Sequence, residues 1–185
     1  MAIAVVYRPP ALTAERCRTS WASGSPTPDP QGSFVPRWPV VPFPNGARVL
    51  GSSIFERRDD DPDPAYGLYL DARWQPTWPA DLIAWRDFGL PEHPQVAARQ
   101  ITAAFARARG GELVEVGCLG GSGRTGTVLA CMAVLAGTPS TQAVAWVRAT
   151  YRADAVETSE QEEWVRWFAQ WAESHPGDPS AYAHG

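Results

Sequence analysis

The feature that most constrains the fold is a short glycine-rich loop between an apolar strand and an apolar helix. It runs Val116-Gly-Cys-Leu-Gly-Gly-Ser-Gly-Arg-Thr-Gly126. Its glycines allow successive backbone N–H groups to turn toward one point, which makes a nest for an anion. The N-terminus of the following helix adds partial positive charge to that nest. The loop therefore predicts a phosphate-binding site at the end of a strand, in an α/β fold.

The same loop contains the spacing of a dinucleotide-binding motif, which is an alternative. Gly121-Ser-Gly-Arg-Thr-Gly126 matches G-x-G-x-x-G. That motif needs a second strand ending in an acidic residue about 20 residues further on. Residues 142–151 have a helical pattern instead, and the loop also lacks the lysine of a nucleoside-triphosphate site. Both nucleotide-binding motifs therefore fit poorly.

Two reactive side chains, Cys118 and Arg124, flank the loop. A cysteine at the mouth of an anion nest, near a helix N-terminus, is in a setting that favours the nucleophilic thiolate. Arg124 can return over the loop and offer its planar guanidinium to two phosphoryl oxygens. Thr125 can donate its hydroxyl to the sulfur. The combination predicts nucleophilic phosphoryl transfer; the alternative is that Cys118 is a small buried apolar residue.

Three stretches carry a resemblance to a known family. Cys118-x5-Arg124-Thr125-Gly126 is similar to the active-site signature of the protein tyrosine phosphatase superfamily. Trp85-Arg-Asp-Phe-Gly-Leu-Pro91 resembles the mobile Trp-Pro-Asp loop of the tyrosine-specific members. Ala155-Val-Glu-Thr-Ser-Glu-Gln161 resembles the family's loop that positions the hydrolytic water. Together they cover about residues 83–168.

The resemblance implies a role for each matched residue. Cys118 would be the nucleophile and Asp87 the general acid, with further catalytic roles for Arg124, Thr125 and Glu157. The phosphate would be bound at Leu119, Gly120, Gly121, Ser122, Gly123 and Arg124. The implied reaction needs no metal and no cofactor. Taken alone, Asp87 would be interpreted as a turn-capping residue, and Glu157 as a first-turn helix charge.

The chain also departs from the family's pattern. Gly117 stands where the family has a histidine that supports the cysteine loop, and Arg86 is the middle residue of the Trp-Pro-Asp triplet. Glu157 occupies the position of the water-positioning glutamine, a substitution seen in smaller members. No tyrosine clearly matches the loop that sets the depth of a phosphotyrosine pocket. These departures concern substrate and rate more than the chemistry.

Hydrophobic periodicity and turn residues predict the elements around these motifs. We expect strands at residues 47–54, 67–74, 82–85 and 112–116. We expect helices from 94 to the glycines at 110–111, from 124 to 135, from 139 to about 151, and after a capping box at 158–161. This order favours an α/β sandwich, a single phosphatase-like domain whose central mixed sheet is flanked by helices.

Three regions are expected along the chain. Residues 1–45 are rich in Pro, Ser and Gly and predict an irregular N-terminal arm, which Trp21, Trp38 and Phe43 could pin to the domain. The phosphatase domain would span residues 46–173, followed by a flexible C-terminal tail at 174–185. The last helix has an aromatic face that is expected to pack into the core, formed by Trp164, Trp167, Phe168 and Trp171.

Bulk properties bear on the protein's environment. The net charge of −4 gives no reason to expect nucleic acid or an anionic membrane as partner. The cysteines Cys17, Cys118 and Cys131 lack metal or CxxC spacing, so neither a disulfide framework nor a zinc site is expected. Residues 1–7 lack the features of a signal peptide, and the longest apolar run, 128–136, is shorter than a membrane span. A soluble, cytoplasmic protein is expected.

The predicted function is hydrolysis of phosphomonoesters through a phosphocysteine intermediate, with protein phosphotyrosine as the favoured substrate. One alternative is a small-molecule phosphatase for inositol or nucleotide phosphates. The loop has no lysine between Cys118 and Arg124, which weakens the case for polyanionic inositides. The other alternative is a catalytically inactive phosphate-binding module, supported only by Gly117 and Arg86. The expected partner is a phosphorylated protein or a small phosphomonoester.

Overall fold

The computed structural model describes residues 38–176. This part of the chain has five strands: β1 (Val40–Pro42), β2 (Arg48–Ser53), β3 (Tyr66–Tyr69), β4 (Ala80–Leu82) and β5 (Val114–Cys118). It has four helices: α1 (Pro94–Arg109), α2 (Gly123–Leu135), α3 (Ser140–Thr150) and α4 (Ser159–Ser174). Trp21 and Cys17 lie outside the described residues. Within them, no helix is long and apolar enough to cross a membrane.

The strands form one mixed sheet in the order β1-β2-β5-β3-β4. β1 is antiparallel to β2, and the other neighbours are parallel. Ser53 is therefore paired with Cys118, and Tyr69 with Gly117, so that the carboxyl ends of β2, β5 and β3 meet at one edge. In open parallel sheets this edge is where ligands bind. The nucleophile candidate is the last residue of the central strand.

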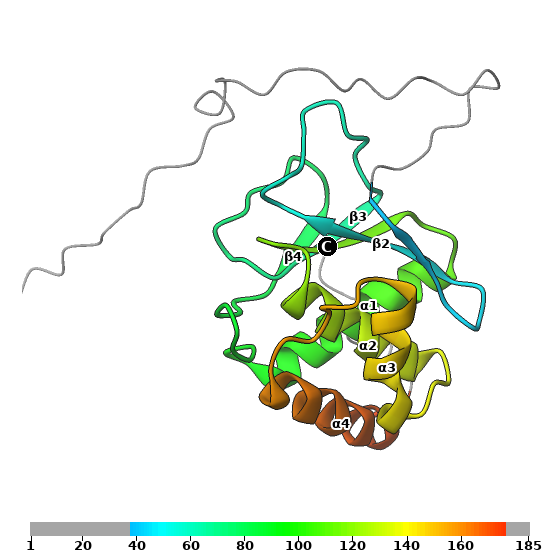
Figure 1. Ribbon diagram of the computed structural model, residues 1–185. Helices are drawn as coiled ribbons and strands as arrows, with labels where there is room; N and C mark the ends of the chain where they lie inside the picture. Colours follow the sequence, from blue (N-terminus) through cyan, green and yellow to red (C-terminus); the bar gives the residue numbers. More distant parts are fainter. Residues whose placement is uncertain (1–37, 177–185) are drawn as a thin grey trace, which may run out of the picture. The chain divides into compact units, whose positions relative to one another are not determined.

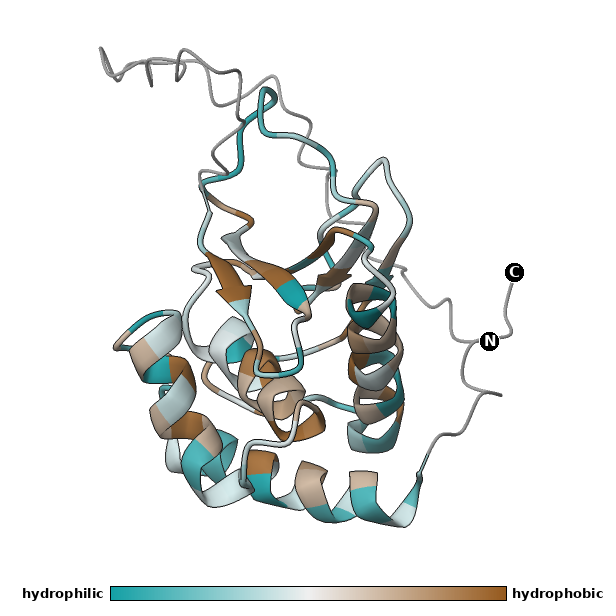
Figure 2. Cartoon of the chain, turned by 90° about the vertical axis from the view of Figure 1, so that its right-hand side faces the viewer, coloured by the Kyte–Doolittle hydropathy of each residue, from teal (hydrophilic) through white to brown (hydrophobic). Residues whose placement is uncertain are grey.

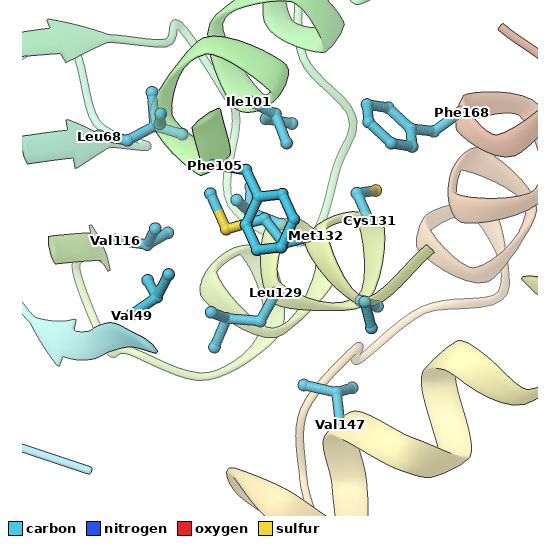
Figure 3. Close-up of a cluster of buried hydrophobic side chains, with 14 of the residues drawn as sticks. Val49, Leu68, Ile101, Phe105, Val116, Leu129, Cys131, Met132, Val147 and Phe168 are labelled. Atoms are coloured by element: carbon cyan, nitrogen blue, oxygen red, sulfur yellow. The ribbon is translucent and has the colours of Figure 1, made fainter. Parts of the chain in front are cut away.

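The four helices lie together on one face of the sheet (Figure 1). Val49, Leu68 and Val116 point from the strands into this layer, where they face Phe105 of α1 and Met132 of α2 (Figure 3). α2 packs against the sheet and against the three other helices. Because it is surrounded, it is apolar on nearly every side, as expected for a buried helix. Apolar residues are concentrated in the strands and in the helices packed against them (Figure 2).

The predicted fold class is confirmed, with small shifts of the element bounds. β5 begins and ends two residues later than the expected 112–116 strand, and the turn before it includes Gly111, which has a positive φ of 91°. The expected strand 67–74 runs from Tyr66 to Tyr69, and the chain bends at Leu70. The strand expected at 82–85 lies at 80–82. α3 begins at Ser140, so that Pro139 is its N-cap and not its first residue.

The strand β1 lies inside the stretch 1–45 that was expected to be irregular. Val41 is fully buried, and the ring of Phe43 packs against Phe105 with 5.1 Å between centroids. The strand is only three residues long, ends in Pro42 and lies between Pro39 and Pro44, so it has no readable alternation. Its pairing with β2 and the burial of Phe43 hold it in place. Residues 40–45 are therefore part of the folded unit.

One of the two hydrogen bonds of the capping box predicted at the start of α4 is present. The Thr158 hydroxyl accepts a hydrogen bond from the Gln161 N–H at 3.2 Å. The return bond is displaced by one residue, because the Gln161 side-chain oxygen accepts from the Glu157 N–H at 2.8 Å. Trp164 and Phe168 are buried and Trp167 and Trp171 are partly buried against the core, as expected for the aromatic face.

Candidate active site

The glycine-rich loop lies between the end of β5 and the start of α2, with Cys118 almost fully buried at its base. Its carbonyl groups are held by neighbours. The Ser53 hydroxyl donates to the Leu119 carbonyl at 2.8 Å, and the Tyr151 hydroxyl donates to the Gly121 carbonyl at 2.5 Å. The Ile54 N–H donates to the Cys118 carbonyl at 2.9 Å. These contacts fix the carbonyls, which supports the prediction that the loop amides form an anion nest.

Gly121 is the loop position that most needs a glycine. Its φ is +66°, in the left-handed region. A Cβ at this position would lie 2.7 Å from the Ser52 carbonyl oxygen, which is backbone and cannot move aside. The loop therefore combines a left-handed turn with close contact to β2.

Gly117, at the position where the resemblance predicted a histidine, is also closely packed. A Cβ there would lie 2.7 Å from the Ser52 hydroxyl oxygen and 3.2 Å from the Tyr69 ring. The space that a histidine side chain would need is thus occupied by residues of β2 and β3. The cysteine loop is supported instead by Ser53 and Tyr151, through the hydrogen bonds described above.

Arg124 is buried and joins three segments of the site. Its Nη1 donates to the carbonyls of Leu70 and Trp85, each at 2.9 Å. Its Nη2 lies 2.9 Å from the Asp87 carboxylate. Its Nε has no hydrogen-bond partner within residues 38–176. A buried N–H donor without a partner is costly, so an anion bound at the loop would satisfy it.

Asp87 lies in a tight turn between Trp85 and Pro91, which form an isolated antiparallel bridge. The Trp85 indole N–H donates to the Gly89 carbonyl at 2.7 Å, and Phe88 has a positive φ of 55°. The Asp87 side chain is 57% exposed, whereas that of Arg124 is 4% exposed. The turn thus presents the carboxylate to the open side of the site.

Glu157 reaches the same site from the segment before α4. Val156 has a positive φ of 60°, and its carbonyl accepts a hydrogen bond from Arg148 at 2.8 Å. The Glu157 carboxylate lies over Gly123 at the start of α2, where a Cβ would clash with it. Partial burial, followed by the nearby Asp87 carboxylate, raises the pKa of Glu157, although Arg124 opposes the shift.

Thr125 and Cys131 are both buried, in the first turn of α2 and in the core. Thr125 is fully buried in the first turn of α2, and its hydroxyl has no hydrogen-bond partner within the described residues. The hydrogen bond from Thr125 to the Cys118 sulfur that the sequence predicted is therefore not made in this structure. Cys131 is fully buried in the core, near Phe168 (Figure 3). Burial raises the pKa of the Cys131 thiol well above its ordinary value, so it stays neutral.

A cavity of about 380 Å³ opens above Cys118. It is lined by the predicted residues Asp87, Cys118, Leu119, Gly120, Ser122, Gly123 and Glu157, together with Ser53, Phe55, Glu56 and Phe88. The structure therefore brings the cysteine, the aspartate and the glutamate to one hollow, and Arg124 is linked to it through its ion pair with Asp87. A second hollow of about 710 Å³ lies between α1 and α4 and contains His93, apart from Cys118.

Metal ligation has little support in this part of the molecule. Within residues 38–176 no group of three or more His, Cys, Asp or Glu side chains could hold a metal ion. The acidic residues of the site are spread over separate segments, and two of them, Asp87 and Glu157, face Arg124.

No protein-family model matches the chain. MJECL20, an uncharacterised protein of Methanocaldococcus jannaschii, is 36% identical to it over 110 residues, which are 53% of this chain and 71% of that protein. The chain belongs to the same family as MJECL20. This relationship places the chain in a family without adding a function to it.

Solved structures identify the fold. The crystal structure of Tk-PTP in the active form superposes with a TM-score of 0.56 at 24% identity, covering 72% of this chain and 98% of that one. Human DUSP28 superposes with a TM-score of 0.52 at 13% identity, covering 74% and 98%. Both are members of the protein tyrosine phosphatase superfamily. The chain has the fold of that superfamily, as its motifs predicted.

Several contributors to the site were not predicted from the sequence. Arg148 resembles a solvated helix charge, but its guanidinium donates to the carbonyls of Ala155 and Val156 at 3.0 and 2.8 Å and so holds the segment before Glu157. Tyr151 and Ser53 hold the cysteine loop through its carbonyls. Every residue has a backbone carbonyl, so the sequence does not indicate which carbonyls these side chains contact.

Proposed function

We propose that this protein hydrolyses phosphomonoesters through a phosphocysteine intermediate, with aryl phosphates such as phosphotyrosine as its favoured substrates. The observation that carries the proposal is the meeting of Cys118, Arg124 and Asp87 at the carboxyl edge of a phosphatase-fold sheet. Cys118 and Asp87 come from separate segments and line one cavity, and Arg124, at the other end of the cysteine loop, is ion-paired with Asp87.

The first step would be an in-line attack of the Cys118 sulfur on phosphorus. A new S–P bond forms while the P–O bond to the leaving group breaks. The loop amides and the free Nε of Arg124 would bind the equatorial oxygens, where charge is concentrated. Asp87 gives its proton to the leaving oxygen, so that a neutral alcohol departs.

The second step would be hydrolysis of the phosphocysteine. A water molecule attacks phosphorus, Asp87 takes a proton from it, and the S–P bond breaks to release phosphate and the thiolate. Glu157 lies beside the start of α2 with its carboxylate over Gly123. It is well placed to accept a hydrogen bond from this water and hold it in line. No metal or cofactor takes part in either step.

The cavity wall supports an aryl substrate. Phe55 and Phe88 line the cavity on separate segments and are 80% and 61% exposed. Exposed rings at a cavity mouth are suited to packing against an aromatic leaving group. The acidic side chains Glu56, Asp87 and Glu157 share the same lining and disfavour a second phosphate group. This favours a monophosphate over an inositol polyphosphate.

The proposal is tested with the wild-type protein. We expect turnover of a phosphotyrosine peptide and of nitrophenyl phosphate, unchanged by EDTA. Vanadate, a five-coordinate mimic of the transferring phosphoryl group, should inhibit competitively. Steady-state kinetics with and without chelator and vanadate provide the measurement. Activity lost with EDTA and restored by a divalent metal would place the protein in another class of phosphatase.

The same experiment separates the alternatives. Inositol and nucleotide phosphates assayed beside the peptide would show a higher kcat/KM if the protein acts on small molecules. Vanadate or phosphate binding without any turnover would identify an inactive binding module.

A further inference from the structure

The strand that ends with Cys118 also carries one partner of a buried ion pair. Glu115 of β5, three residues before Cys118, has 1% of its side chain exposed, and Arg57 has 5% exposed. Their Nη1 and Oε2 atoms are 2.5 Å apart, and the other Glu115 oxygen accepts from the Ser52 hydroxyl at 2.6 Å. Because side chains alternate along a strand, Glu115 lies on the sheet face opposite Val116 and the helices. The mechanism above makes no use of this pair.

Arg57 has further contacts that fix its position. Its Nη2 donates to the Pro62 carbonyl at 2.9 Å, and its guanidinium lies over the Trp78 ring, 4.4 Å from the centroid. Figure 1 shows the segments after β2 and β3 on the side of the sheet away from the helices. Arg57 therefore joins β5, the segment after β2 and the segment before β4 at one point. A planar guanidinium can make these contacts together, whereas a lysine cannot.

The residues just before Arg57 form one wall of the Cys118 cavity. Ser53, Phe55 and Glu56 all line it. The N–H groups of Ile54 and Phe55 donate to the carbonyls of Cys118 and Leu119 at 2.9 and 3.2 Å. The Phe55 ring itself is 80% exposed, so little side-chain packing holds it. Two buried side chains flank it: Ser53, which contacts the cysteine loop, and Arg57, which reaches Glu115 on β5.

We propose that Arg57 is a positioning residue that holds Phe55 at the cavity mouth and thereby sets the affinity for aryl substrates. It acts by tying residues 53–57 to the buried Glu115 on the strand that carries the nucleophile. The inference rests on the proposed function, since it concerns the substrate side of the same site. It assigns to an arginine remote from the phosphate a role in choosing the leaving group.

The test is a double-mutant cycle between Arg57 and Phe55. Arg57→Lys keeps the positive charge beside Glu115 but cannot contact Glu115 and the Pro62 carbonyl together. Arg57→Met removes the charge as well. For a phosphotyrosine peptide, we expect KM to rise about two- to tenfold in Arg57→Lys, as for the loss of one aromatic contact, with kcat unchanged. Phe55→Ala should raise KM similarly, and the double variant should add nothing further. Vanadate affinity should be the same in all.

Two kinetic results would overturn the inference. One is an unchanged KM with a kcat that falls in proportion to the folded fraction, which would make Arg57 a residue of stability alone. The other is full additivity with Phe55→Ala. Hydrogen exchange at the Ile54 and Phe55 amides gives a readout independent of turnover: we expect faster exchange in Arg57→Lys, and unchanged exchange would reject the positioning role. A wild-type protein without hydrolysis would reject the proposed function instead.

Discussion

Replacing Cys118 by serine is expected to abolish hydrolysis of nitrophenyl phosphate while leaving vanadate binding measurable. A serine hydroxyl stays protonated and cannot take the place of a thiolate nucleophile. The loop carbonyls remain held by Ser53 and Tyr151, so the anion nest should persist. In a serine protease, which also forms a covalent intermediate, loss of the nucleophile lowers kcat by roughly six orders of magnitude. Steady-state turnover and vanadate titration of the two proteins measure both effects.

A matched control uses the other described cysteine. Cys131→Ala alters a thiol that is buried in the core and far from the cavity lining. It should lower the free energy of unfolding and leave kcat/KM of the folded protein unchanged. Comparable turnover by wild type and Cys118→Ser would remove Cys118 from the chemistry.

Replacing Asp87 by asparagine is expected to slow poor leaving groups much more than good ones. A phenolate of high basicity, such as tyrosine, needs a proton as its bond to phosphorus breaks, whereas nitrophenolate leaves with little help. General acid catalysis contributes roughly two to four orders of magnitude. The loss should therefore approach that range for phosphotyrosine and shrink as the leaving group improves. Values of kcat/KM over a series of aryl phosphates give one slope for each protein.

The slopes also separate the two roles that the geometry allows. One role is that of the general acid. The other is to hold Arg124, because the Asp87 carboxylate lies 2.9 Å from its guanidinium. If Asp87 only holds Arg124, hydrolysis of every substrate should slow by the same factor in Asp87→Asn, and the slopes for the two proteins should be parallel. Parallel slopes would exclude Asp87 as the general acid, and the other acids of the cavity lining, Glu56 and Glu157, would be the next to test.

The local parts of the site could be predicted from the sequence. Cys118 and Arg124 flank a single loop, and a strand, a glycine-rich turn and an apolar helix each have their own pattern. The helix α2 was readable because it is apolar on all sides. The approach of Asp87 to Arg124 depends on the packing of separate segments. It was expected only through the resemblance to a family.

Long-range polar contacts were beyond prediction. Glu115 and Arg57 are 58 residues apart, and an alternating glutamate in a strand indicates a solvated face. The pair is buried because the segments after β2 and β3 cover that face of the sheet. Arg148 was missed for a related reason, since its partners are the backbone carbonyls of Ala155 and Val156. Such contacts follow from tertiary packing and not from residue type.

Trapping the covalent intermediate tests the central claim most directly. The wild-type protein is mixed with an aryl phosphate, quenched during the first turnovers and digested, and its peptides are examined by mass spectrometry. The account predicts one added phosphoryl group on Cys118, formed before phosphate is released and absent from Cys118→Ser. A phosphoryl group on another side chain, or phosphate release by Cys118→Ser at the wild-type rate, would contradict it.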